Sequence, residues 1–186
     1  IRTRRPFRPP MNGPTALLRS IAFSVDGRML AAGGEDNSVI VWDLQERRPE
    51  GKALIGHRAP VNAVAFHPEA ALLASASGDG NVILWDLERF QPISLPLTVA
   101  EKPVFDVAFS PDGRTLVSTS EDRLVVWNVF GDTPLRHKFK MPDQKNSGLV
   151  FSSDGKTVAT INTYGEVTLA DAKTGRILRD SIGTRV

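Results

Sequence analysis

The chain has no cysteine among its 186 residues, which excludes both a disulfide framework and a thiolate metal site. Its three histidines, His57, His67 and His137, fall at unrelated positions, so no converging set of metal ligands is predicted. No apolar run approaches the ~18 residues of a membrane-spanning helix. No segment sustains the 3.6-residue apolar period of a long helix. These absences predict a protein without metal, membrane partner or long helices.

An excess of one charge is also missing, because 23 basic and 21 acidic residues leave a formal net charge of +2. This balance is too small to indicate a nucleic-acid partner by itself. No glycine motif cradles a phosphate, since Gly78-Asp79-Gly80 lies in a predicted hairpin rather than between a strand and a helix. The Asp-Gly turns each offer a lone carboxylate, which does not suit calcium. We therefore expect no cofactor and no catalytic residues, and the lack of cysteine fits a cytoplasmic protein.

The stretch Gly56–Leu87 is the most complete copy of a unit that the rest of the chain repeats. Its landmarks are Phe66, Trp85 and Asp86. Steps of about 43 positions place these landmarks on a matching set three more times: Phe23, Trp42 and Asp43; Phe109, Trp127 and Asn128; and Phe151, Ala170 and Asp171. Self-similarity at such a period indicates a repeat architecture rather than one or two conventional domains.

Each repeat reads as a meander of short antiparallel strands. In the first repeat, strands are predicted over 18–23, 29–33 and 38–44, separated by turns that contain Asp-Gly or similar signals. The second repeat has His67-Pro68-Glu69-Ala70 at its first turn, where Pro68 suits a type I turn. Fourth, outer strands are predicted at 52–54, 93–95 and 136–140. Because such a sheet cannot bury both faces alone, successive units must stack face to face.

The phase of the repeat divides the chain into five segments. Residues 1–15 are interpreted as the outer strand of a preceding unit, and repeats follow over 16–56, 57–98 and 99–140. Residues 141–186 hold the fourth repeat and the start of a further one. The first segment is basic and proline-rich, so a basic arm for nucleic acid or an acidic partner is the alternative. Its prolines suit an edge strand, where a missing N–H is harmless.

These residues resemble the WD40-repeat β-propellers. The match rests on Gly56-His57 with Trp85-Asp86, on Trp42-Asp43, and on the turn Ser110-Pro111-Asp112-Gly113, repeated along the chain. The resemblance implies an all-β fold whose blades are four-stranded antiparallel meanders, with four blades in this chain. Propellers of this family mostly have about seven blades. We therefore expect a segment of a larger ring, with pairing of two copies or a closed four-bladed ring as alternatives.

The resemblance also implies a buried polar network in each blade, built from a histidine, a serine or threonine, an aspartate and the tryptophan. Only the second repeat has all four: His57, Ser75, Asp79 and Trp85. A buried aspartate needs hydrogen-bond donors, which imidazole, hydroxyl and indole groups extend into a chain. We interpret this set as a stabilising device rather than a hydrolase triad. The second blade is expected to be the most rigid, and the fourth, which has Thr160, Tyr164 and Ala170 at these positions, the least.

In this family, partners often bind the face where the loops between blades meet. By alignment, six residues are candidates for contacts with a partner: Arg19, Glu35, Asn62, Phe105, Glu121 and Ser147. Phe105 places an apolar ring where the other repeats have polar residues, and packing between blades is its alternative role. Glu35 and Glu121 could meet a basic partner, although an exposed glutamate is usually only solvated.

The resulting hypothesis is a scaffold for protein–protein contacts, with unidentified protein partners and no catalysis of its own. Self-association or further blades would complete the ring. A regulatory or sensor domain of a larger signalling protein, of the NTPase or kinase type, is the first alternative. Binding of nucleic acid through the N-terminal arginines is the second, and salt-dependent affinity would support it.

Overall fold

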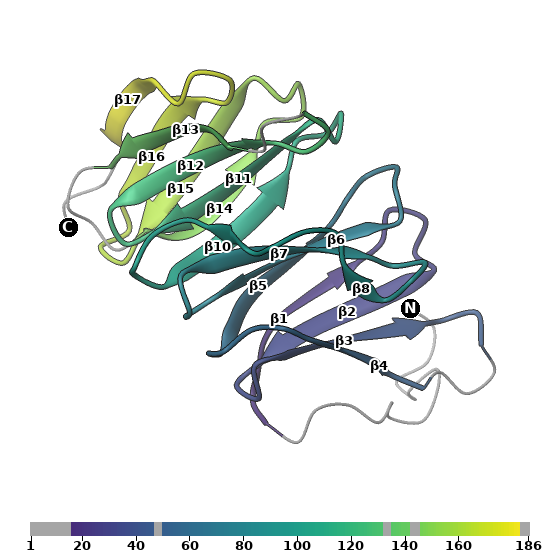
Figure 1. Cartoon of the computed structure of the whole chain (residues 1–186). Helices are drawn as coiled ribbons and strands as arrows, with labels where there is room; N and C mark the ends of the chain where they lie inside the picture. Colours follow the sequence, from purple (N-terminus) through teal and green to yellow (C-terminus); the bar gives the residue numbers. More distant parts are fainter. Residues whose placement is uncertain (1–15, 47–49, 132–134, 142–145, 183–186) are drawn as a thin grey trace, which may run out of the picture.

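The computed structural model describes residues 16–46, 50–131, 135–141 and 146–182, and within these ranges it contains β-strands and turns but no helix. Four antiparallel sheets lie side by side in an open arc (Figure 1). We call them blades 1 to 4. The basic segment 1–15 lies outside the described residues, as do Pro14 and Pro142, which stand at the network histidine position in repeats 1 and 4.

Blade 1 consists of β1 (Leu18–Phe23), β2 (Met29–Gly34), β3 (Ser38–Asp43) and β4 (Lys52–Ile55). Blade 2 consists of β5 (Val61–Phe66), β6 (Leu72–Ser77) and β7 (Asn81–Asp86), with the short β8 (Gln91–Pro92) and β9 (Leu97–Thr98). Blade 3 consists of β10 (Val104–Phe109), β11 (Thr115–Ser120), β12 (Arg123–Asn128) and β13 (Leu135–Lys140). Blade 4 consists of β14 (Asn146–Phe151), β15 (Thr157–Asn162), β16 (Val167–Asp171) and β17 (Ile177–Ile182). In blades 1, 3 and 4 the strands pair in chain order, as the meander predicts.

The predicted outer strand at 93–95 is wrong. In blade 2 the chain instead pairs with β7 twice, through β8 and then through β9, and residues 93–95 form a bend between the two. Pro92 and Pro96 flank this bend, and neither has an N–H to donate to a ladder. Ile93 still donates its N–H to the carbonyl of Leu84, at 2.9 Å. The two prolines therefore split one outer strand into two short pieces.

The turns between the first two strands of blades 1, 3 and 4 share one side-chain motif. In blade 3, the Ser110 hydroxyl donates to Asp112, and the same carboxylate accepts the Arg114 N–H at 3.1 Å. Gly113 follows at φ +68°, a conformation that glycine adopts without steric strain. Blade 2 builds the turn differently, because His67 Nδ1 accepts the N–H groups of Glu69 and Ala70, at 3.0 and 2.8 Å. The predicted hairpin therefore forms without glycine.

Most of the core lies between the blades, and a smaller cluster belongs to blade 1 alone. One apolar cluster joins blades 1 and 2 around Val61 and Trp85, a second joins blades 2 and 3 around Val104, and a third joins blades 3 and 4 around Val158. No further described blade packs on the first or last face of the arc, although Leu30, Ala32 and Trp42 on the first face are buried. Ile21 of β1 is 63% exposed, whereas its equivalents Val64 and Val107 are 7% and 3% exposed. The described residues therefore do not close a four-bladed ring, and each end presents half of an interblade interface.

Candidate functional site

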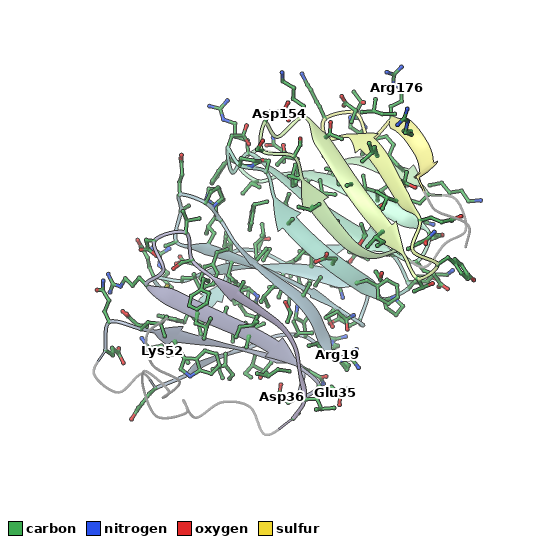
Figure 2. The ribbon with its side chains drawn as sticks, turned by 180° about the vertical axis from the view of Figure 1, so that it is seen from behind. Arg19, Glu35, Asp36, Lys52, Asp154 and Arg176 are labelled. Carbon is green, nitrogen blue, oxygen red and sulfur yellow. The ribbon has the colours of Figure 1, made fainter. Side chains whose placement is uncertain are left out.

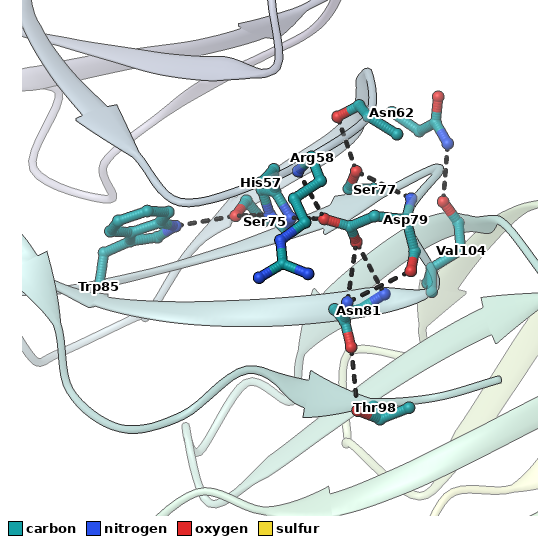
Figure 3. A network of polar contacts seen from close by, with 11 residues as sticks. His57, Arg58, Asn62, Ser75, Ser77, Asp79, Asn81, Trp85, Thr98 and Val104 are labelled. Atoms are coloured by element: carbon teal, nitrogen blue, oxygen red, sulfur yellow. Dashed lines mark hydrogen bonds and ion pairs between the residues drawn. The ribbon is translucent and has the colours of Figure 1, made fainter. Parts of the chain in front are cut away.

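The four polar residues of blade 2 form one hydrogen-bonded chain (Figure 3). His57 lies in the linker after β4, Ser75 in the middle of β6, Asp79 in the turn before β7, and Trp85 near the end of β7. Trp85 Nε1 lies 2.8 Å from Ser75 Oγ, which lies 2.7 Å from His57 Nε2. His57 Nδ1 lies 3.0 Å from an Asp79 carboxylate oxygen. The arrangement brings together residues from a loop, a turn and two strands.

The donors define a direction along this chain. The Trp85 indole can only donate, so Ser75 accepts from it and donates its own hydrogen to His57 Nε2. His57 then carries its proton on Nδ1 and donates to Asp79. The Asp79 carboxylate also accepts the N–H groups of Arg58, at 2.9 Å, and Asn81, at 3.0 Å. Each polar group therefore has a partner while His57 is neutral and Asp79 is ionised.

Burial determines the charge states in this network. Desolvation lowers the pKa of His57, and the neighbouring Asp79 offsets this only in part. Burial by itself raises the pKa of Asp79, but the Arg58 N–H, the His57 ring and the Asn81 N–H together hold that pKa below its usual value. The Ser75 side chain is fully buried, so its hydroxyl cannot reach a substrate. The set that looks most like a catalytic triad thus forms a buried hydrogen-bonded network in this geometry.

The network makes the stability of the chain depend on pH. His57 in the unfolded chain takes up a proton near pH 6.5, whereas the folded protein resists it because the pKa is lowered. Below pH 6.5 the unfolded state therefore binds more protons, and the free energy of unfolding is expected to fall by at most about 1.4 kcal/mol per pH unit from this residue. Urea unfolding between pH 7.5 and 5.5 measures the slope. His57→Gln should flatten it, and an unchanged slope in that variant would contradict the assignment.

The other blades hold only parts of the network. In blade 3, Trp127 Nε1 donates to Ser118 Oγ at 2.9 Å, but Ala100 stands in place of the histidine and Asp122 Oδ1 is buried without a partner. In blade 4, Thr160 Oγ1 is buried without a partner. Blade 2 is thus the most fully hydrogen-bonded at these positions. We expect the slowest amide hydrogen exchange there, and slowest exchange in blade 4 would count against this prediction.

Restoring the histidine in blade 3 should stabilise the protein. An open hollow of about 400 Å³ lies beside Ala100 and Asp122, so an imidazole at position 100 has room. Ala100→His is expected to raise the free energy of unfolding by about 1 kcal/mol by giving Asp122 and Ser118 a hydrogen-bond partner. Chemical denaturation checks this. The gain should shrink when Ser118→Ala is added, and a gain that survives the second change undiminished would point to another cause.

Four of the six candidate binding residues occupy one structural position, a β-bulge. Each innermost strand shifts its register by one residue near its start, and the extra residue is Arg19 in β1, Asn62 in β5, Phe105 in β10 and Ser147 in β14. A bulge bends the strand and re-aims the side chain of the extra residue. All four bulges lie at the same end of their blades.

Three of the six candidate binding residues, Arg19, Glu35 and Asn62, are joined by hydrogen bonds within and between blades. Arg19 Nη1 donates to Asn62 Oδ1 at 2.8 Å, and Arg19 Nη2 lies 3.0 Å from Glu35 Oε1. Arg19 and Glu35 lie together at one end of blade 1 (Figure 2). Asn62 in turn donates to the carbonyl of Val104 in blade 3, at 2.8 Å (Figure 3). These three residues therefore form a ladder across the first three blades.

The remaining candidates are more separate. Glu121 pairs with Lys102 at 3.1 Å, and both side chains are partly exposed. Phe105 is half-buried, and Ser147 is exposed, with its hydroxyl 3.4 Å from the carbonyl of Ile161. Position alone therefore does not divide the six into binding and packing residues.

Sequence reasoning missed two residues that join neighbouring blades. His67 Nε2 donates to the carbonyl of Gly113 in blade 3, at 3.0 Å. Asp106 accepts the N–H of Leu149 in blade 4, at 2.7 Å, as well as the N–H of Val107, at 2.8 Å, and its burial raises its pKa. The signal was present in the alignment: His67 stands where the other turns have serine, and Asp106 aligns with Ser20, whose hydroxyl accepts the Val64 N–H at 3.1 Å.

Two kinds of site are not found in the part of the chain that the structure describes. Within it, no three histidine, aspartate or glutamate residues gather in a way that could hold a metal ion. The same residues include no helix long and apolar enough to cross a membrane.

In a comparison with known protein families, three of the four blades match a family model. The family model described as "WD domain, G-beta repeat" matches residues 9–43, 49–86 and 94–128, which cover more than half of the chain. The three segments contain the first three strands of blades 1, 2 and 3. No curated protein matches the chain.

Proposed function

Because the chain belongs to the WD40 repeat family, we propose that its blades form a scaffold for protein–protein contacts, without catalysis of their own. WD40 repeats generally mediate such interactions. The observation that carries the proposal is the row of four β-bulges, which present Arg19, Asn62, Phe105 and Ser147 at the same end of the four blades. One geometry with four different side chains suits the recognition of a varied surface.

Blade packing supports the use of this end as a rigid platform. Arg19, Asn62 and Val104 are linked from blade to blade, so the bulged residues hold fixed positions relative to one another. Fixed positions reduce the entropy lost on binding. In blade 3, we propose that Phe105 and Glu121 contact the partner. An aromatic ring beside a charged rim is typical of the centre of a protein–protein interface. The open end faces are proposed to pack against further blades.

A comparison of two variants tests the scaffold. Phe105→Asp with Glu121→Lys should remove proteins that cross-link to the wild-type chain in an extract, measured by quantitative mass spectrometry. Lys156→Glu with Lys173→Glu, at the opposite end of the blades, should leave the same proteins bound. Equal losses in both variants would contradict the location. Ester hydrolysis by the purified chain that disappears in Ser75→Ala would contradict the absence of catalysis.

A further inference from the structure

At the end of the blades opposite the bulges, the joint between blades 2 and 3 is filled by one imidazole ring. The His67 ring packs edge-on against Phe109, with centroids 5.1 Å apart, and against Phe130, at 5.5 Å. Its Nε2 donates to the Gly113 carbonyl at 3.0 Å. Two aromatic rings and one carbonyl therefore form a seat for a planar side chain.

A related seat, with one aromatic ring instead of two, exists between blades 1 and 2, and no side chain of the described residues fills it. By the repeat, Phe66, Glu88 and Ala70 occupy the positions of Phe109, Phe130 and Gly113, and Ser24 occupies the position of His67. Ser24 is too short to reach across the joint. A hollow of about 500 Å³ opens there, lined by these four residues and by Met29 among others. We call it the Ser24 hollow.

The rim of the Ser24 hollow is acidic. Asp26, Glu69 and Glu88 line it, and among the described lining residues Arg28 is the only lysine or arginine. That guanidinium is already paired with Asp43, at 2.8 Å. The Ser24 hydroxyl and the Arg28 N–H lower the pKa of Asp26, which keeps its carboxylate ionised at neutral pH. Among the described residues, the rim therefore carries three carboxylates against one guanidinium.

The corresponding joint between blades 3 and 4 offers a contrast. It also has serine in the position of His67, namely Ser110, and it also opens into a hollow, of about 640 Å³. Its lining includes three acids and three bases: Asp112, Asp154, Asp171, Arg114, Lys156 and Lys173. A hollow thus occurs in both joints, whereas the excess of acidic over basic residues in the described lining belongs to the joint between blades 1 and 2.

We propose that the Ser24 hollow binds a basic segment of a partner protein and receives an aromatic side chain of that segment in the seat that His67 fills in the next joint. The floor of Phe66 and Leu87 supplies apolar contact, and the rim attracts the flanking lysines or arginines. This proposal rests on the proposed scaffold function only in assuming that the chain binds proteins. It lies away from the bulges, so either surface can fail without the other.

The test uses the full chain and the labelled peptide acetyl-Gly-Arg-Lys-Phe-Arg-Lys-Gly-amide in a fluorescence anisotropy titration. We expect binding that weakens as salt increases, and at least tenfold weaker binding when serine replaces the phenylalanine of the peptide. Ser24→His, which places in blade 1 the ring that blade 2 already has, should weaken binding at least tenfold by filling the seat.

A second variant tests the same proposal without placing a histidine in the turn that contains Ser24. Glu69→Lys with Glu88→Lys reverses two partly or fully exposed charges of the rim and should also weaken binding at least tenfold. Glu101→Lys makes the same type of change at the opposite end of the blades and should alter the affinity less than twofold. Absence of peptide binding, or equal affinity for wild type and the charge-reversal variant, would overturn the proposal.

Two results that assign the Ser24 hollow to another occupant would also overturn the proposal. Self-association in sedimentation velocity that Ser24→His abolishes would assign the hollow to a second copy of the chain. A tenfold gain in peptide affinity in Phe7→Ser would assign it to the chain's own segment Arg4-Arg5-Pro6-Phe7-Arg8. If the partner is a separate protein, Phe7→Ser leaves the affinity unchanged and the chain remains monomeric at peptide-binding concentrations.

Discussion

Trp85→Ala is expected to lower the free energy of unfolding by about 3–5 kcal/mol, the range for removing a large buried aromatic side chain. Trp85 is almost fully buried in the cluster that joins blades 1 and 2. The loss has two parts, because the indole fills space against Gly56 and its N–H holds the Ser75 hydroxyl. Urea denaturation monitored by circular dichroism measures the change.

Trp85→Phe separates the two parts, since it keeps much of the apolar volume and removes only the N–H. We expect a coupling energy of about 1 kcal/mol or more between Trp85→Phe and Ser75→Ala, because the change propagates to His57 and Asp79. Blade 3 provides the matched pair, Trp127→Phe with Ser118→Ala, in which the chain ends at the serine. Equal coupling in the two blades would show that the longer network adds nothing.

Gly80→Ala is expected to lower the free energy of unfolding by about 3 kcal/mol, from two effects that act together. Gly80 has φ +84°, where a Cβ is strained by about 1–2 kcal/mol. A Cβ there would also overlap the Ala100 carbonyl oxygen, which is backbone and cannot rotate away. The same Gly80 accepts the Val99 N–H at 3.0 Å, so the turn of blade 2 is tied to the linker that leads to blade 3.

Gly27→Ala is the matched control for this change. Gly27 has φ +67°, and a Cβ at that position would meet no heavy atom within 4 Å. Only the conformational term remains, so a loss of about 1 kcal/mol is expected. Thermal or urea unfolding of both variants gives the difference. Equal losses at the two glycines would mean that the backbone near Ala100 moves to accommodate the new Cβ. The close approach between turn and linker would then contribute nothing to the free energy of unfolding.

Much of the fold can be predicted from short-range patterns in the amino-acid sequence. The Asp-Gly turns fix hairpins over a few residues because the Ser, Asp and Gly of each turn satisfy one another locally, as at Ser110, Asp112 and Gly113. Repetition of this pattern predicts four stacked sheets. The chemistry of His57 and Asp79 also follows from residue type, because a buried carboxylate requires donors and the repeat supplies them at the right places.

The errors and omissions arise where two or more repeats meet. The split of the outer strand into β8 and β9 depends on which N–H groups β7 can pair, and two prolines decide that only once the strands are adjacent. His67 looked like a turn residue, yet its ring closes a joint with a blade 46 positions further on. Contacts over such separations leave no periodic signal, since one copy of the repeat can carry them alone.

The amino-acid sequence by itself determined the all-β repeat and the turn chemistry, because each depends on neighbours within one repeat or on the period between repeats. The residues of the polar network followed from the resemblance to the WD40 repeats. Tertiary structure decided how the candidate residues are presented. The bulges that carry Arg19, Asn62, Phe105 and Ser147 exist only in the pairing of each inner strand with the next. Stacking decided which joint is filled and which is hollow, because that depends on side chains from two blades at once.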